Sequence, residues 1–189
     1  MYKVLITGTS SGLGKHLALK FEKEGYSVFR HNGRKHYDLC DKESVLRLAN
    51  DAKGVSILIN NAAIACPGKE LSLYSDNEIV KMISVNLIAP ILLTHCLLSS
   101  LTNIININSM VGLEIKKLRT LYSATKWGLR GFSQSLKAEN KNISVLDVYS
   151  TNIKTSPNRE NALDLDFVVD SIFNAFIDKK QELILDGRK

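Results

Sequence analysis

The sequence contains little of what metal sites and disulfide frameworks require. Its 189 residues include four histidines and only three cysteines, at Cys40, Cys66 and Cys96. An odd number of widely spaced cysteines fits neither a disulfide framework nor a zinc site. We therefore expect reduced thiols, as in cytoplasmic proteins, and no bound metal.

Long apolar segments are also missing. The longest apolar run contains Asn86 and Pro90, so no uninterrupted stretch reaches the length of a membrane span. The amino terminus enters an apolar strand pattern directly, without the architecture of a signal peptide. We expect a cytoplasmic protein with no membrane partner.

Charge is not concentrated in any segment. Lysine and arginine number 25 against 19 aspartate and glutamate residues, which gives a formal net charge of +6. A nucleic-acid-binding surface usually shows basic residues interleaved with aromatic ones, and the sequence has no such stripe. We expect no nucleic-acid partner, because an anionic cofactor or simple solubility explains the charge as well.

Short apolar runs and helical apolar periods alternate along the chain. The runs predict strands and the periods predict helices. Predicted strands cover residues 2–7, 26–30, 55–60, 103–108, 143–149 and 182–185, with at most a small strand at 36–39, and predicted helices cover 13–24, 41–50, 75–99, 122–140 and 165–178. This alternation predicts one α/β domain, residues 1–189, with a parallel sheet and right-handed crossovers.

A glycine-rich loop follows the first predicted strand at once. Its glycines are spaced Gly-x-x-x-Gly-x-Gly, which differs from the commoner Gly-x-Gly-x-x-Gly fingerprint, and a plain glycine-rich turn is the alternative. Between a strand and a helix, such glycines let backbone N–H groups approach a pyrophosphate at the positive end of the helix dipole. The residues predicted to form this cradle are Gly8, Ser10, Ser11, Gly12, Leu13 and Gly14.

The end of the second predicted strand indicates the type of dinucleotide. Enzymes that select NAD usually place an acid here to bind the ribose 2′-hydroxyl. This sequence instead has Arg30, Arg34 and Lys35, and its first acid is Asp38. The pattern favours a 2′-phosphate and hence NADP over NAD, with a solvated basic loop as the alternative.

Two further features concern the middle of the chain. The third long strand ends in small and polar residues, among them Asn60 and Ala62, which suit contact with a flat ring or a ribose. Pro90 cannot donate a hydrogen bond to the carbonyl four residues back, which belongs to Asn86. The sequence therefore predicts a distortion at Asn86 that frees a polar group, or a kink that merely bends the helix.

Tyr122 and Lys126 lie four residues apart, so a helix places their side chains on one face. An ammonium beside a phenol favours the phenolate and brings its pKa toward that of a general acid/base. Ser109 follows a predicted strand, and its hydroxyl could meet the tyrosine across a crevice at the carboxyl end of the sheet. A surface Tyr–Lys pair is the alternative for the motif alone.

Taken together, these motifs resemble the short-chain dehydrogenase/reductase family over nearly the whole chain. The shared signatures are Thr7-Gly8-x-x-x-Gly12-x-Gly14, Asn-Asn-Ala at 60–62, Asn86, Ser109 and Tyr122-x-x-x-Lys126. The resemblance implies a doubly wound Rossmann fold and hydride transfer between a nicotinamide and a carbonyl or alcohol.

The resemblance also implies a role for each residue. Tyr122 is the acid/base, and Lys126 binds the nicotinamide ribose and lowers the pKa of the tyrosine. Ser109 bonds the substrate oxygen, and the Asn86 backbone holds a water in a proton relay. Two further cofactor contacts are implied, by Asp38 to the adenine and by Thr155 to the nicotinamide side.

The sequence departs from the family at three points. Ser150-Thr151 replaces the usual Pro-Gly, Ala63 replaces the last glycine of Asn-Asn-Ala-Gly, and the chain is shorter than typical members. The short chain leaves little to enclose a large substrate, so we expect a small or exposed carbonyl. The resemblance also suggests a homodimer or homotetramer. The alternatives are a catalytically idle NADP-binding sensor, or an epimerase or dehydratase that uses the same tyrosine and lysine.

Overall fold

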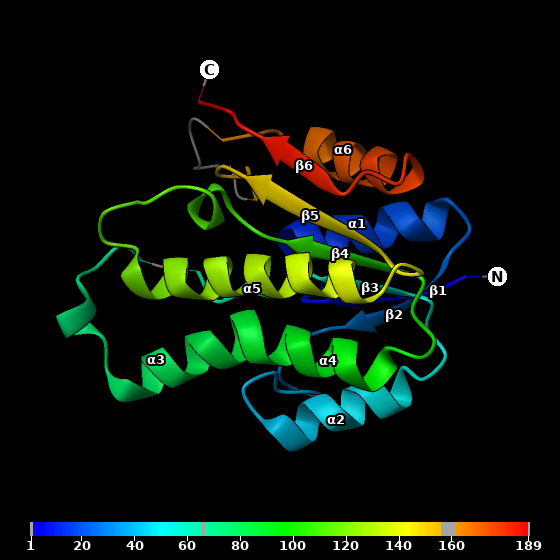
Figure 1. Cartoon of the computed structure of the whole chain (residues 1–189), viewed down its shortest axis with the longest axis horizontal. Helices are drawn as coiled ribbons and strands as arrows, with labels where there is room; N and C mark the ends of the chain where they lie inside the picture. Colours follow the sequence, from blue (N-terminus) through cyan, green and yellow to red (C-terminus); the bar gives the residue numbers. More distant parts are fainter. Residues whose placement is uncertain (1, 66, 156–161, 189) are drawn as a thin grey trace.

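The computed structural model describes residues 2–65, 67–155 and 162–188, and a six-stranded parallel sheet runs through it (Figure 1). The strand order is β2-β1-β3-β4-β5-β6. The strands are β1 (Lys3–Thr7), β2 (Ser27–His31), β3 (Ile57–Asn60), β4 (Asn103–Ile107), β5 (Ser144–Ser150) and β6 (Glu182–Leu185). The α-helices are α1 (Gly12–Lys23), α2 (Lys42–Asp51), α3 (Asp76–Ile83), α4 (Ala89–Leu97), α5 (Thr120–Glu139) and α6 (Leu165–Ile177).

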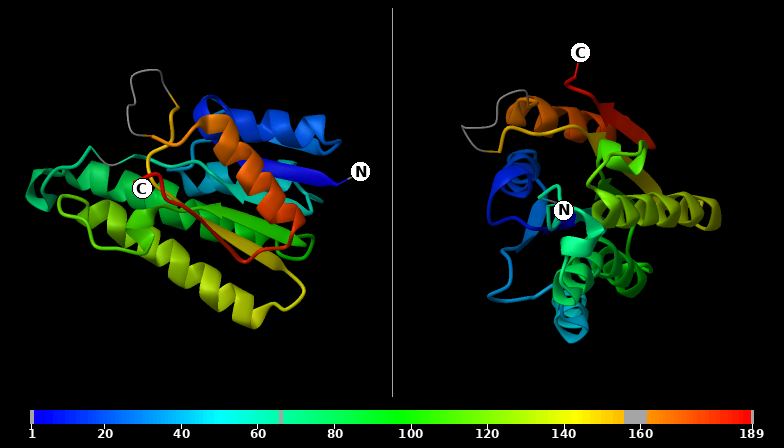
Figure 2. Two further views of the ribbon diagram at one scale, coloured as in Figure 1. Left: turned by 90° about the horizontal axis from the view of Figure 1, so that it is seen from above. Right: turned by 90° about the vertical axis from the view of Figure 1, so that its left-hand side faces the viewer.

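Helices cover both faces of the sheet (Figure 2). On one face, α1 and α6 pack over a core that includes Val4 and Ile6 of β1. On the other face, α2, α4 and α5 cover a core that includes Leu5 of β1 and Leu58 of β3. Alternate residues of the buried strands therefore pack into the cores on opposite faces of the sheet, as expected for a parallel sheet covered on both sides. The doubly wound α/β fold predicted from the sequence is confirmed.

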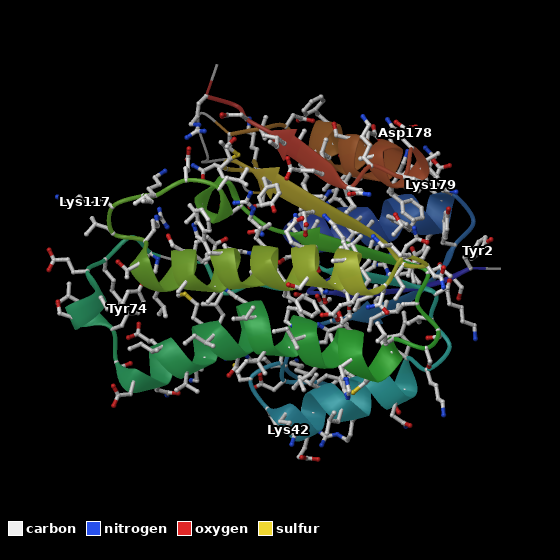
Figure 3. All side chains as sticks on the ribbon, in the orientation of Figure 1. Tyr2, Lys42, Tyr74, Lys117, Asp178 and Lys179 are labelled. Atoms are coloured by element: carbon white, nitrogen blue, oxygen red, sulfur yellow. The ribbon has the colours of Figure 1, made fainter. Side chains whose placement is uncertain are left out.

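The topology predicts a crevice beyond the carboxyl ends of the strands. The chain leaves β1 to form β2 on one side and then crosses to form β3 on the other side. Ligands of open α/β sheets bind beyond the carboxyl ends of the strands at such a reversal. Figure 3 shows Tyr74 and Lys117 at this end of the molecule and Tyr2 and Lys179 at the opposite end.

Two details of the predicted elements are corrected by the structure. Residues 36–39 form turns and no strand, so β2 is the edge of the sheet next to β1. The single helix predicted over residues 75–99 is interrupted by a π-helical turn, Ser84–Ile88, between α3 and α4. Because Pro90 has no N–H to donate, the regular hydrogen-bond ladder fails at this turn. The distortion expected at Asn86 is therefore present.

By length and composition alone, one helical stretch within the described ranges could cross a membrane. It is Asp76–Leu97, a stretch of 22 residues that contains an 18-residue window with a mean hydropathy of 1.7. Asn86 and Pro90, which were expected to interrupt this run, both lie within it. In the structure, Leu93 and Leu97 of the stretch pack in the core shared with α2 and the sheet.

Candidate active site

Two adjacent cavities lie along the carboxyl edge of the sheet. The first has a volume of about 330 Å³ and the second about 430 Å³. Asn61 and Ala63, from the loop after β3, line both cavities, so the two lie side by side, and we refer to them together as the cleft. The predicted cofactor residues that line the first cavity are Gly8, Ser10, Ser11, Leu13, Gly14, Arg34, Asp38 and Ala62. Those that line the second cavity are Tyr122, Lys126 and Thr155, with Ser109 beside them.

The glycine loop is held in a shape that only glycine allows at two positions. Gly8 has a φ of +72°, in the left-handed region. At Gly14, an added Cβ would lie 2.3 Å from the Gly8 carbonyl oxygen and 2.4 Å from Asn61 Nδ2. The start of α1 therefore lies directly against the loop, with its N-terminus toward the first cavity. This geometry fits a phosphate at the positive end of a helix.

The two arginines at the end of β2 lie in different surroundings. Arg34 lines the first cavity, beyond the strand. Arg30 instead points toward α1 and makes two hydrogen bonds to the Glu22 carboxylate, at 2.6 and 2.8 Å. The structure does not bring Arg30 to the cleft, because side chains of a strand alternate between the two faces. Of the two predicted phosphate contacts, the geometry supports only Arg34.

The adjacent asparagines Asn60 and Asn61 also differ. Asn60 is buried on the α5 side of the sheet, where its Nδ2 donates to Asn106 Oδ1 at 2.8 Å. The cleft is lined by Asn61, whose Nδ2 donates to the carbonyl oxygens of Thr7 and Gly8. Asn60 therefore supports the sheet and Asn61 holds the glycine loop. The Asn60 side chain, predicted as a cofactor contact, therefore lies away from the cleft, and Asn61 lines it instead.

Lys126 is buried, with its side chain at the floor of the second cavity. Its ammonium donates to the Ile107 carbonyl oxygen at 2.9 Å and lies 5.6 Å from the centroid of the Tyr122 ring. Burial lowers the pKa of Lys126 to about 8. The lysine is therefore still mostly protonated at neutral pH. The surface Tyr–Lys pair considered as an alternative is excluded for Lys126, which is 3% exposed.

Ser109 and Tyr122 face the same cavity from two elements. Ser109 follows β4 and caps a short 3₁₀ turn, Met110–Gly112, where its Oγ accepts from the Val111 N–H at 3.3 Å. Tyr122 is half-buried in the first turn of α5. An Oγ that accepts one bond keeps its own proton to donate. The arrangement can offer two hydroxyl donors to one oxygen atom in the cavity.

Asn86 lies in the π-helical turn and connects three parts of the site. Its Oδ1 accepts from the Ile64 N–H at 2.7 Å, and its Nδ2 donates to the Ile64 carbonyl at 3.1 Å. The same Nδ2 approaches Thr125 Oγ1 of α5 at 3.4 Å. This side chain therefore fixes the loop after β3 against the helix that carries Lys126. The water relay at the Asn86 carbonyl stays a prediction.

Thr155 and Gly12 link the two ends of the cleft. A Cβ added at Gly12 would lie 3.3 Å from Thr155 Cγ2, so the segment after β5 passes over the start of α1. Ser150 and Thr151, which stand where the family has Pro-Gly, also line the second cavity.

Cys66, for which a reduced thiol was expected, lies outside the described residues, whereas Cys40 and Cys96 are free thiols. Within the described ranges, no group of His, Cys, Asp or Glu side chains could hold a metal ion.

The cleft contains residues that the sequence analysis did not select. His31 and Tyr37 line the first cavity, and Arg119 and Arg188 line the second. Strand alternation could have indicated His31, since it follows Arg30 and must face the opposite side of β2. No sequence pattern brings Arg188, near the end of the described chain, to this cavity.

The fold and the cleft define a doubly wound α/β protein with a glycine-rich cradle beside a cavity that holds a serine, a tyrosine and a buried lysine. The family model described as "short chain dehydrogenase" matches residues 34–165. The chain belongs to the short-chain dehydrogenase/reductase family.

Individual relatives agree with this assignment. The chain is 32% identical over 171 residues to Nodulation protein G of Rhizobium sp. (strain N33), covering 76% of this chain and 69% of that protein. It is 30% identical over 181 residues to the 3-oxoacyl-[acyl-carrier-protein] reductase FabG of Buchnera aphidicola, covering 80% of this chain and 73% of that protein.

Solved structures show the same fold at lower identity. A short-chain dehydrogenase from Sphingobium yanoikuyae in complex with NADPH has a TM-score of 0.83 and 22% identity, covering 100% of this chain and 88% of that chain. A 4-hydroxyisoleucine dehydrogenase complexed with NADH has a TM-score of 0.84 and 24% identity, covering 99% of this chain and 97% of that chain.

Proposed function

We propose that the protein is an oxidoreductase that transfers a hydride between NADP(H) and a small carbonyl or alcohol substrate. The observation that carries the proposal is the joint position of Ser109, Tyr122 and Lys126 on one cavity that adjoins the glycine-loop cavity. Solved relatives of the same fold contain NADPH or NADH. The close approach of Gly14 to Gly8 sets the N-terminus of α1 directly against the glycine loop, which fits a dinucleotide phosphate.

The cofactor would lie along the whole cleft. Ser10, Ser11 and the N-terminus of α1 would hold the pyrophosphate, and Asp38 would contact the adenine. Lys126 would hold the nicotinamide ribose through its ammonium, and Thr155 the nicotinamide side. The bound nicotinamide supplies the hydride.

The side chains of the second cavity carry out the proton chemistry. Ser109 donates a hydrogen bond from Oγ to the carbonyl oxygen of the substrate and orients it. Tyr122 donates its phenolic proton to the same oxygen as the carbonyl carbon is reduced, which yields the alcohol. The Lys126 ammonium stabilises the phenolate left on Tyr122, which then regains a proton from solvent.

A turnover assay with a panel of aldehydes and ketones tests this function. We expect NADPH to be consumed in step with alcohol formation. Tight NADPH binding without turnover across the panel would instead support the idle sensor. Conversion of a substrate with no net change in NADPH would support epimerisation or dehydration.

Preference for NADP over NAD is expected to depend on Arg34. A charge-assisted contact to the 2′-phosphate contributes about 1.5–3 kcal/mol, so Arg34→Ala should weaken NADP binding roughly ten- to a hundredfold and leave NAD binding unchanged. Dissociation constants for both dinucleotides measure this.

The control is Arg30→Ala, since Arg30 is bonded to Glu22 outside the cleft. We expect this variant to keep the wild-type ratio of NADP to NAD affinity. Equal losses for both dinucleotides in Arg34→Ala would show that this arginine does not bind the 2′-phosphate.

A further inference from the structure

The imidazole of His31 is buried at the end of β2, in the wall of the first cavity. Its Nδ1 lies 3.0 Å from the backbone nitrogen of Gly8, and its Nε2 lies 2.9 Å from the Tyr37 carbonyl oxygen. A backbone N–H can only donate, so Nδ1 must be an acceptor. The proton of the neutral ring is then on Nε2, which donates to Tyr37. Both bonds are made together by one tautomer of the neutral ring only.

These bonds make His31 one of two side chains that hold the first glycine of the cradle. The Gly8 N–H is bound by His31 from one side of β1, and the Gly8 carbonyl is bound by Asn61 Nδ2, at 3.2 Å, from the other side. The neighbouring Thr9 is tied to the same loop, because its N–H donates to the His31 carbonyl at 2.9 Å and its Oγ1 to Asn32 Oδ1 at 2.7 Å. The glycine loop is thus fixed against the end of β2.

We propose that His31 is a positioning residue of the dinucleotide site, which holds the glycine loop in its binding shape only while its imidazole is neutral. This inference rests on the proposed function, since it concerns the cavity assigned there to the cofactor. A protonated imidazole carries a hydrogen on Nδ1, which would point at the Gly8 N–H. The loop must then move away from β2, and dinucleotide affinity must fall.

The surroundings of His31 agree with a neutral ring. Burial lowers its pKa below 6.5, against weaker opposing effects of the Tyr37 carbonyl and the Asp38 carboxylate. Among the residues that line the cavity, the charged groups are Asp38 and Arg34, both from the loop after β2. The lining residues from β1, α1 and the loop after β3 carry no charge. Because the pKa of His31 is lowered, we expect the affinity to fall only at a pH below the ordinary histidine pKa of about 6.5.

Two substitutions separate the two hydrogen bonds of the ring. His31→Asn places an amide oxygen near the position of Nδ1 and can still accept from Gly8. His31→Gln places an amide N–H near the position of Nε2 and can still donate to Tyr37, but offers no acceptor at Gly8. Because one neutral hydrogen bond is at stake, we expect NADPH to bind about three- to tenfold more weakly to His31→Gln than to His31→Asn at pH 7.5.

The pH dependence supplies the second readout. Between pH 7.5 and 5, the affinity of the wild type for NADPH should fall by more than that of His31→Asn, which cannot titrate. Circular dichroism of each variant confirms that it is folded. If His31→Gln does not fold, the pH dependence of NADPH affinity in the wild type and in His31→Asn still tests the proposal.

Equal affinities of the two variants, or parallel pH curves for wild type and His31→Asn, would overturn the inference. An affinity that rises on acidification relative to His31→Asn would also overturn it, since attraction of a charged imidazole to phosphate would then dominate. Failure of the wild type to bind NADPH at pH 7.5 would count against the proposed function itself.

Discussion

Replacement of Tyr122 by phenylalanine is expected to lower kcat by at least about a hundredfold, the scale of general acid/base catalysis. The substitution removes the phenolic proton that reaches the substrate oxygen but keeps the ring beside Lys126. NADP affinity should change little, because most contacts assigned to the dinucleotide lie on the glycine loop, the loop after β2, Lys126 and Thr155. Steady-state kinetics on any aldehyde or ketone that the wild type reduces, together with NADPH titration, measure both quantities.

Ser123→Ala provides a matched control for this experiment. Ser123 is the next residue of α5 and lines neither cavity. We expect its kcat to stay within about twofold of the wild type, since it removes a hydroxyl of the same helix turn without touching the chemistry. Near-normal turnover by Tyr122→Phe would show that Tyr122 is not the general acid/base.

The second large effect concerns stability. Lys126 keeps an ammonium in the interior, and its pKa is lowered from 10.5 to about 8 by burial. At neutral pH the lysine is charged in both the folded and the unfolded chain, and only the folded chain has the cost of desolvation. At 1.36 kcal/mol for each pH unit, this shift corresponds to about 3 kcal/mol of lost stability at pH 7.

The sign of the pH dependence follows from the same shift. Between about pH 8 and 10.5 the unfolded chain binds more protons at this lysine than the folded chain does, so stability rises with pH. Lys126→Met lacks this group. We expect the wild type to gain about 2 kcal/mol relative to Lys126→Met between about pH 7 and 9.5. Urea unfolding of both cofactor-free proteins measures the difference, and parallel curves would show that Lys126 is not desolvated as described.

Sequence reasoning located the elements and most of the cleft because both depend on local patterns. Apolar runs and periods indicated all six strands of the sheet, and the spacing of Tyr122 and Lys126 indicated that they share a helix face. It could not show that Lys126 is buried, because its partner, the Ile107 carbonyl, lies on another element. Burial of a charged group is a property of the tertiary structure.

Two of the predicted cofactor residues lie away from the cleft for a common reason. Arg30 and Asn60 have the right chemistry for a cofactor contact, but both belong to strands and face away from the cleft. Val28, two residues before Arg30, packs under α1, so the period of two along β2 already places Arg30 on that side. The facing residues are the next in sequence, His31 and Asn61, whose roles depend on the backbone of Gly8.

The π-helical turn at Ser84–Ile88 also has a consequence for the angular phase of the helix. A turn that holds one extra residue sets the following side chains back by about 100° relative to an uninterrupted α-helix. Before the turn, Met82 packs with Leu121 at the start of α5; after it, Leu93 packs in the core shared with α2. One continuous helical axis thus presents differently oriented apolar stripes to two partners. If the same residues formed an uninterrupted α-helix, the stripe after the turn would lie about 100° further round the axis and would lose its contact with the core shared with α2.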